Sequence, residues 1–557
     1  MNKEKKIIGG SIGNCVHIAG VYEFLRMAEK YNHKTNFLGA AIDVKRFVFE
    51  IKEFNPDIIC ISYRLTAKGL ISILNNFFSL LKKEKLSEGK LFYFGGTPEC
   101  IEVAKKYKQF NHFFKGEENY DIITQALDFS HQIQAKEDND FETSLFDIKI
   151  AETKQSKADN EYVLPMIRHH FGLPTLKETI DGIKKIADAK VVDVLSIATD
   201  QNAQEFFFNP EKIDDDLTGA GGVPVRTEDD MNALYDASQR GNYPRLRIYS
   251  GTRDLMKWAD MSVRTINNAW AAIPLFWYSE LDGRSKRKLE DSITENMKVI
   301  KWYAERNIPV EINDSHHWSL REGADVTAVF DAYLVAYNAK KLGVKTYISQ
   351  LMLNTPRLTT PKMDIAKMLA KIEFIQELED DSFKVLKQIR AGLTHFSTDI
   401  DVAKGQLAAS TVLAIALKPE IIHVVSYSEA SHAATPENVI ESCRIVKGVI
   451  RNMWKGLPDL TKDKDVIERK NYLLEEARKL KSISLEYFKD DVDDPLSNPK
   501  YLAKLIKTGF LDAPQLKGNP VALGVIKTLP NNGGYDIIDN SGKVISITEY
   551  CNKILAK

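Results

Sequence analysis

The chain has 557 residues, with 76 lysines and arginines against 77 aspartates and glutamates. The formal net charge of -1 gives no electrostatic argument for binding to nucleic acid or an anionic membrane, and no window approaches the roughly 20 apolar residues that a membrane span needs. Five scattered cysteines without a Cys-x-x-Cys pair argue against disulfides, structural zinc and iron–sulfur clusters. We therefore expect a cytoplasmic protein of two or more domains that acts on a small molecule.

Apolar runs of strand length alternate with amphipathic helical stretches through the first part of the chain, which we assign to a domain at residues 1–133. A strand near residues 7–10 leads to a helix from Ala19, a strand at Thr35–Leu38 and a helix from Asp43. This alternation predicts an α/β domain with a doubly wound, flavodoxin-like sheet of five parallel strands.

Polar residues and glycines follow three of these strands, at the edge where open α/β sheets bind ligands. The loop SIGNCVHIAG follows the first strand, the segment DIICIS ends a second, and KLFYFGG ends a third. In chain order these strand ends carry His17 and Gly20, then Ser62 and Thr66, then Gly95 and Gly96.

These residues resemble the signature of the cobalamin-binding domain of adenosylcobalamin mutases and methionine synthase, which is Asp-x-His-x-x-Gly, then Ser-x-Leu, then Gly-Gly. The resemblance implies that His17 displaces the cofactor's own base and ligates cobalt, while the displaced tail enters a slot lined by Ser62 and the glycines. Glycine suits such a slot because a side chain would block it. Cys15 stands in place of the family's aspartate, and Arg64 in place of its leucine. The alternative is that His17 sits in a turn of an ordinary flavodoxin-like domain.

A polar stretch at residues 134–161 is typical of an interdomain linker and precedes a second domain, which we place at residues 162–462. Eight strand-like segments, each followed by helical periodicity, predict a (β/α)8 TIM barrel there. The predicted strands are Tyr162–Arg168, Val191–Ala198, Leu246–Tyr249, Ala272–Tyr278, Val310–Asn313, Thr346–Gln350, Thr394–Asp399 and Ile421–Tyr427. Residues 463–557 predict a small C-terminal extension, with a charged helix and then hairpin signals such as NNGG.

The carboxyl ends of barrel strands are where such enzymes place their catalytic side chains. Arginines there would hold a carboxylate or phosphate, and carboxylates would hold an ammonium group. We predict substrate binding by Arg168, Asp200, Gln201, Arg226, Tyr249, Tyr278 and Asn313. We predict catalytic roles for Asp200, Tyr249, Asp314 and Glu429.

The barrel segment LRIYSGTRDLMKWA and the stretch Pro309–Asn313 resemble the large subunit of glutamate mutase. Together with the first domain, this resemblance implies an adenosylcobalamin-dependent radical isomerase with both parts in one chain. That family grips its dicarboxylate with arginines, whereas Asp200 and Tyr249 stand at the corresponding positions here, so we expect a different small amino or carboxylic acid. We also expect a homodimer. A corrinoid-dependent methyltransferase and a non-catalytic cobalamin-binding protein stay open as alternatives.

Overall fold

The computed structural model describes residues 4–30, 32–116, 164–453, 456–489 and 492–556. The chain divides into two compact units, Met1–Phe141 and Glu142–Lys557. The predicted interdomain linker at residues 134–161 lies outside the described residues.

A five-stranded parallel sheet forms the first unit. Its spatial order, β2-β1-β3-β4-β5, is that of flavodoxin-like doubly wound sheets. The strands are β1 (Lys6–Ile12), β2 (Lys34–Ile42), β3 (Ile58–Tyr63), β4 (Leu91–Gly96) and β5 (Phe110–Phe114). The helices are α1 (Ala19–Lys30), α2 (Val44–Phe54), α3 (Ala67–Lys83) and α4 (Pro98–Ala104). Apolar side chains of α1 pack on one face of the sheet, and those of α2, α3 and α4 on the other.

The register of this sheet aligns the ends of three strands. Ser11 of β1 pairs with Ser62 of β3, and Ser62 pairs with Gly95 of β4. The strands are largely apolar before this row because helices cover both faces of the sheet. The sheet therefore brings the predicted ligand-binding residues to one edge, as the sequence indicates.

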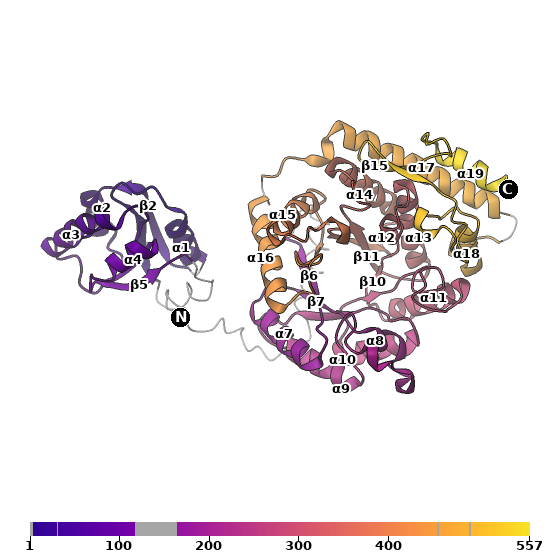
Figure 1. The fold of residues 1–557 in the computed structure, drawn as a ribbon, viewed down its shortest axis with the longest axis horizontal. Helices are drawn as coiled ribbons and strands as arrows, with labels where there is room; N and C mark the ends of the chain where they lie inside the picture. The colour runs from indigo at the N-terminus through magenta and orange to yellow at the C-terminus, as the bar shows by residue number, and fades with distance from the viewer. Residues whose placement is uncertain (1–3, 31, 117–163, 454–455, 490–491, 557) are drawn as a thin grey trace. The chain divides into compact units, whose positions relative to one another are not determined.

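Eight parallel strands form a nearly closed barrel in the second unit, ringed by helices (Figure 1). The strands are β6 (Met166–Phe171), β7 (Val194–Ile197), β8 (Arg245–Ile248), β9 (Ala271–Ala272), β10 (Val310–Ile312), β11 (Thr346–Met352), β12 (Lys384–Arg390) and β13 (Ile421–Val424). The two ends of the sheet are joined by backbone hydrogen bonds from Ala269 N to Leu246 O (2.9 Å) and from Ser250 N to Ala272 O (3.2 Å).

The barrel helices follow the strands in turn, as a (β/α)8 pattern requires. They are α7 (Leu176–Asp188), α8 (Gln201–Phe206), α9 (Glu228–Ser238), α10 (Leu255–Ile266), α11 (Leu289–Glu305), α12 (Ser315–Leu320), α13 (Asp325–Lys341), α14 (Pro361–Gln376), α15 (Ile400–Ala416) and α16 (Pro436–Met453). Within the described parts of the chain, no helix combines the length and apolar character needed to cross a bilayer.

The prediction of the seventh strand at Thr394–Asp399 was wrong. The strand is β12, and the predicted segment instead forms a 3-10 turn at Leu393–His395, after which Asp399 caps α15. The segment KVLKQIR lacks the apolar pattern of a buried strand, because Gln388 and Arg390 point into the barrel and are buried there. The prediction of the fourth strand at Ala272–Tyr278 was also wrong, since β9 is Ala271–Ala272 and shares only Ala272 with the predicted segment.

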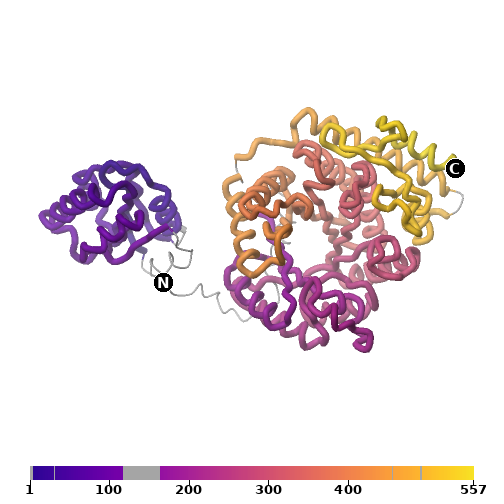
Figure 2. The backbone as a smooth tube through the Cα atoms, in the orientation of Figure 1, coloured from indigo at the N-terminus to yellow at the C-terminus, as the bar shows by residue number. Residues whose placement is uncertain are grey.

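The C-terminal extension belongs to the same unit as the barrel and lies along its outer helices (Figure 2). It comprises α17 (Lys464–Phe488), α18 (Pro499–Lys507), the hairpin β14 (Thr528–Asn531) and β15 (Gly534–Ile537), and α19 (Ile547–Leu555). Arg469 of α17 bridges Asp325 of α13 (2.8 Å) and Asp536 of β15 (2.6 Å). The predicted helix and hairpin are therefore present, and the extension adds an outer layer to one side of the barrel.

Candidate functional site

A cavity of about 630 Å³ opens at the carboxyl edge of the first sheet, between the loop after β1, the ends of β3, β4 and β5, and the helix α1. Apolar side chains such as Phe24 and Phe114 form part of its wall. Five residues predicted from the sequence line it together: His17, Gly20, Ser62, Gly95 and Gly96. Thr66 does not line the cavity; it caps α3, where its side chain accepts a hydrogen bond from Gly69 N.

Hydrogen bonds hold the His17 loop against β3. Ser62 Oγ donates to His17 O (3.0 Å), and Ser11 Oγ donates to Ser62 O (3.3 Å). Cys15 is buried behind the loop, where its Sγ accepts a hydrogen bond from Arg64 N (3.2 Å) and lies 3.5 Å from Nδ1 of His17. The exposed imidazole thus has its Nδ1 side toward the thiol, which leaves Nε2 as the nitrogen available to a metal.

The glycines that line this cavity differ in the space around them. A Cβ on Gly20 would meet no atom within 4 Å, and one on Gly95 would come no closer than 3.9 Å to its nearest neighbour, Phe114. Side chains at these two positions would therefore occupy open space at the cavity. Gly96 differs, because its Cβ would lie 2.6 Å from Tyr63 O and 2.8 Å from Phe94. Gly96 is required by the packing of β4 on β3.

This lining fits the cobalamin tail that the family resemblance implies. Cavities of a few hundred Å³ with apolar walls and a few fixed polar groups are typical small-molecule sites. The phenyl rings of Phe24 and Phe114 offer an apolar wall for an aromatic base, while His17 stands exposed at the opening. The residues present are therefore compatible with a cobalamin whose lower ligand is His17.

A second cavity, of about 370 Å³, lies in the barrel at the carboxyl ends of β6, β7, β8, β12 and β13. Its polar lining consists of His169, His170, Tyr249, Arg390, His423, Ser426 and Glu429. Two of these, Tyr249 and Glu429, are predicted catalytic residues, and the predicted Arg168 lies beside the cavity, in contact with His170.

Beneath this cavity the barrel is filled by a buried ionic network. The Oε2 atom of Glu311 accepts hydrogen bonds from Arg247 Nη2 (3.0 Å), Arg168 Nη1 (3.4 Å) and Trp270 Nε1 (2.7 Å). Arg390 adds a third guanidinium at the cavity wall. Arg168 and Arg247 thus share one fully buried carboxylate, and with Arg390 nearby the excess of positive charge favours an anionic ligand.

Burial and the arginines keep the imidazoles of this cavity neutral. Burial lowers the pKa of His169 to about 4, and it lowers the pKa values of His170 and His423 well below the ordinary value, with Arg168 lowering all three further. For Tyr249, burial raises the pKa, but the charges of Arg247 and Arg168 outweigh it and the net shift is downward. At neutral pH these imidazoles therefore act as polar groups without charge.

The carboxyl of Glu429 stands at the rim of the same cavity. Burial raises its pKa, while the charge of Arg390 acts in the opposite direction. Glu429 and Arg390 thus line the same cavity, where the carboxylate favours a cationic group of a ligand and the guanidinium favours an anionic group.

Asp200 does not line the barrel cavity and is fully engaged in holding the loop after β7. It accepts hydrogen bonds from Ala203 N (2.8 Å) and Gly219 N (3.0 Å), and Arg226 grips both of its oxygens at 2.6 and 3.0 Å. Asp200 is completely buried. Asp200 and Arg226 therefore form an ion pair with each other, and neither lines the cavity. Gln201 is exposed at the start of α8.

The remaining predicted residues lie after β9 and β10, outside the lining of the cavity. Asp314 accepts hydrogen bonds from Leu275 N (2.6 Å) and Phe276 N (2.8 Å), and burial raises its pKa to about 7. Tyr278 has a left-handed backbone (φ 62°), with the Arg284 guanidinium 4.2 Å from its ring centre. Asn313 is buried.

Arg247, Arg390 and His423 were not predicted from the sequence as site residues. A signal for two of them was present, since inward-facing residues of a strand recur at every second position. The polar pairs Arg247 with Tyr249 and Gln388 with Arg390 have this spacing.

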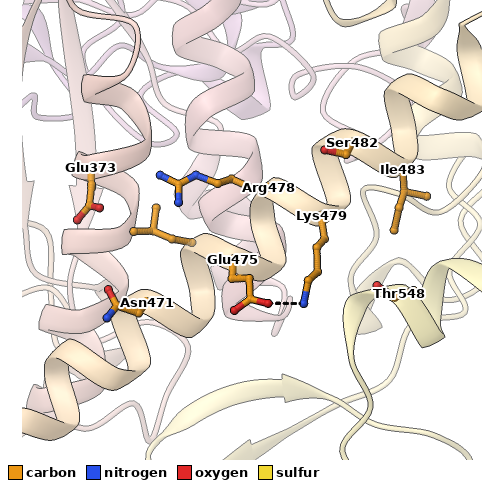
Figure 3. Close-up of a pocket in the computed structure, with 9 residues that line it drawn as sticks. Glu373, Asn471, Glu475, Arg478, Lys479, Ser482, Ile483 and Thr548 are labelled. Carbon is orange, nitrogen blue, oxygen red and sulfur yellow. Dashed lines mark ion pairs between the residues drawn. The ribbon is translucent and has the colours of Figure 1, made fainter.

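A further groove of about 670 Å³ runs between α14, α17 and α19 (Figure 3). Its charged side chains are paired within the chain, so we assign no ligand to it. The pairs are Glu475 with Lys479 (2.7 Å), Arg478 with Glu377 (2.5 Å) and Glu373 with Lys470 (2.6 Å). Among the residues that the structure describes, no group of three or more histidines, cysteines or carboxylates is arranged to hold a metal ion.

Comparisons with known proteins give no family assignment. No protein-family model matches the chain, and no curated protein matches its sequence. Among solved structures, a novel cobalamin-binding protein from Desulfitobacterium hafniense DCB-2 is similar over 23% of this chain and 60% of its own, with 24% identity and a TM-score of 0.20. The cobalamin-dependent S-adenosylmethionine radical enzyme OxsB, with aqua-cobalamin and S-adenosylmethionine bound, matches 90% of this chain and 71% of its own at 11% identity and a TM-score of 0.18. NtrX from Brucella abortus, in complex with ATP, matches 88% of this chain and 94% of its own at 10% identity and a TM-score of 0.17.

Proposed function

We propose that this chain is an adenosylcobalamin-dependent radical isomerase acting on a small amino or carboxylic acid. The observation that supports it most is the cavity at the edge of the first sheet, where His17, Gly20, Ser62, Gly95 and Gly96 meet. When bound, the cofactor supplies radical chemistry, and the protein supplies binding, orientation and enclosure.

In the first unit, His17 is the residue that would bind cobalt, through Nε2. Ser62 holds the His17 loop by its hydrogen bond to the His17 carbonyl. Gly20 and Gly95 leave the space that the displaced tail would occupy. The thiol of Cys15 takes the orienting position beside Nδ1.

In the barrel, Arg390 is our candidate for binding a substrate carboxylate. Its Nε donates to Ala391 O (3.2 Å), and this is the one hydrogen bond that its side chain makes to the described chain. Its terminal N–H groups therefore remain for a ligand, and a guanidinium can bind a carboxylate through two parallel hydrogen bonds. Glu429, on the same wall, would accept hydrogen bonds from an ammonium group.

The experiment that tests this function has two stages. Cobalamin binding is first measured by absorbance titration of the purified full chain. The adenosylcobalamin-loaded protein is then mixed with small amino and carboxylic acids, and the formation of cob(II)alamin is followed. We expect one class of acid to trigger it and Arg390→Met to abolish the response. Arg444→Met, an exposed arginine on α16, serves as the control.

The alternatives give different outcomes. Transfer of a methyl group from methylcobalamin, without any response to adenosylcobalamin, would identify a corrinoid methyltransferase. Cobalamin binding without turnover of either form would identify a binding protein. The homodimer is likewise a proposal, which light scattering of the purified full chain tests.

A further inference from the structure

Arg168 and His170 lie two residues apart on β6, so both side chains point into the barrel. The Nη2 atom of Arg168 lies 2.8 Å from Nε2 of His170. A guanidinium has five N–H groups and accepts no hydrogen bond, so Arg168 must be the donor. Nε2 of His170 must therefore be the acceptor and carries no hydrogen.

Arg168 cannot turn away from this contact without losing others. Its Nε donates to Ser196 Oγ on β7 (2.7 Å), and its Nη1 donates to Gln388 Oε1 on β12 (2.8 Å) and to Glu311 on β10. Three other strands thus fix the guanidinium, and all of these partners are buried. The donor that faces His170 is rigid because the barrel wall holds it.

Contacts with two neighbouring aromatic rings also fix the imidazole of His170. It stacks on Tyr249, with ring centres 5.4 Å apart and planes inclined by 19°, and the Tyr249 hydroxyl lies 3.4 Å from the same Nε2. The ring centre of His423 lies 4.8 Å from that of His170. Turning the ring over would exchange Nε2 for a carbon atom at the guanidinium, so these contacts favour one orientation.

The other nitrogen of His170 is left for the cavity. Nδ1 has no hydrogen-bond partner in the described chain and is not among the polar atoms buried without one. Because His170 lines the cavity, we infer that Nδ1 faces it. Burial and three arginines hold the pKa of His170 well below its ordinary value, so the ring is neutral and its single hydrogen is on Nδ1.

We propose that His170 is a substrate-binding residue that donates a hydrogen bond from Nδ1 to an acceptor oxygen of the ligand, with Arg168 as the positioning residue that fixes this tautomer. His170 would then serve the barrel as a neutral donor beside Arg390, and it would not act as a base. The inference rests on the proposed function only in assigning the barrel cavity to a substrate.

The tautomer is tested on the cobalamin-free full chain by two-bond proton–nitrogen NMR after nitrogen-15 histidine labelling. His170 is assigned by the signal lost in His170→Asn. We expect a neutral ring with hydrogen on Nδ1 from pH 6 to pH 8, and a mixture of tautomers in Arg168→Met, while the exposed His432 keeps its signal. If Arg168→Met does not fold, Ser196→Ala takes its place, because it removes only the hydrogen-bond acceptor of Arg168 Nε. Hydrogen on Nε2, or a charged ring at pH 7, would overturn the proposal.

The donor role is tested with acetate as the probe, by saturation-transfer NMR. An asparagine amide can take the place of Nδ1, whereas a glutamine amide reaches the place of Nε2. We therefore expect His170→Asn to bind acetate like the unmodified chain and His170→Gln to bind about tenfold more weakly, the loss typical of one hydrogen bond to a charged acceptor. Equal binding by both variants would remove His170 from the site. If the unmodified chain does not bind acetate, the carboxylate site of the proposed function fails, while the tautomer result stands independently.

Discussion

The Sγ atom of Cys15 lies 3.5 Å from Nδ1 of His17, in the position where a carboxylate would orient a metal-binding imidazole. The thiol is a weak hydrogen-bond acceptor, and it already accepts from Arg64 N. The chain therefore retains an orienting contact for His17 but a weaker one than a carboxylate provides.

Removal of the thiol in Cys15→Ala should weaken cobalamin binding. Outer partners of metal-binding histidines are commonly worth 10–100-fold in affinity, and a weak acceptor should lie at the lower end, so we expect about a tenfold loss. Absorbance titration with cobalamin measures it. An unchanged dissociation constant would show that the 3.5 Å contact does not orient His17.

The two neighbouring glycines should respond differently to substitution. Gly95→Leu projects into open space, so it should block cobalamin binding while the domain stays folded. Gly96→Ala brings a methyl group against Tyr63 O and should destabilise the domain by about 1–3 kcal/mol, as overpacking usually does. Calorimetric unfolding and cobalamin titration of both variants separate these effects. Normal cobalamin binding by Gly95→Leu would show that the cavity is not the tail site.

Asp200→Asn should act on the stability of the barrel. The substitution leaves Arg226 without its charged partner, and breaking a buried pair commonly costs about 3–5 kcal/mol. Because Arg226 is partly exposed, we expect about 3 kcal/mol. All six tryptophans lie in the second unit, so urea unfolding followed by tryptophan fluorescence reports on the barrel alone. Asp229→Asn, on the exposed start of α9, should cost about 0.5 kcal/mol as the control. A stable Asp200→Asn with altered substrate choice would instead support the role predicted from the sequence.

The buried imidazole of His169 should make the barrel less stable in acid. Its pKa is lowered by burial to about 4 in the folded chain, against about 6.5 when unfolded. Between these values the unfolded chain binds more protons, so the unfolding free energy falls as the pH falls. From pH 7 to pH 5, the chain should lose about 2 kcal/mol relative to His169→Gln, which lacks the titrating group. Urea unfolding at the two pH values measures the difference, and an equal loss in both proteins would contradict the shift.

The cofactor site could be predicted because its residues follow apolar strands directly. The parallel register aligns Ser62 and Gly95 at one edge, and the loop after β1 brings His17 to the same cavity. The barrel site was predicted less well, since its polar residues lie inside the barrel and interrupt the apolar pattern that reveals a strand. Arg390 ends β12 (Lys384–Arg390), whereas this strand was predicted at Thr394–Asp399. Asp200 follows a strand as predicted, yet its helix cap and its pairing with Arg226 depend on a loop whose course the sequence does not specify.

The measurement that tests the central claim most directly is the electron paramagnetic resonance spectrum of the protein loaded with cob(II)alamin after growth on nitrogen-15 histidine. The nucleus of the axial nitrogen splits the cobalt lines, so nitrogen-15 gives doublets and the unlabelled base of the cofactor gives triplets. We predict doublets that disappear in His17→Ala. Triplets in the unmodified protein would show that the cofactor keeps its own base and that His17 is not the cobalt ligand.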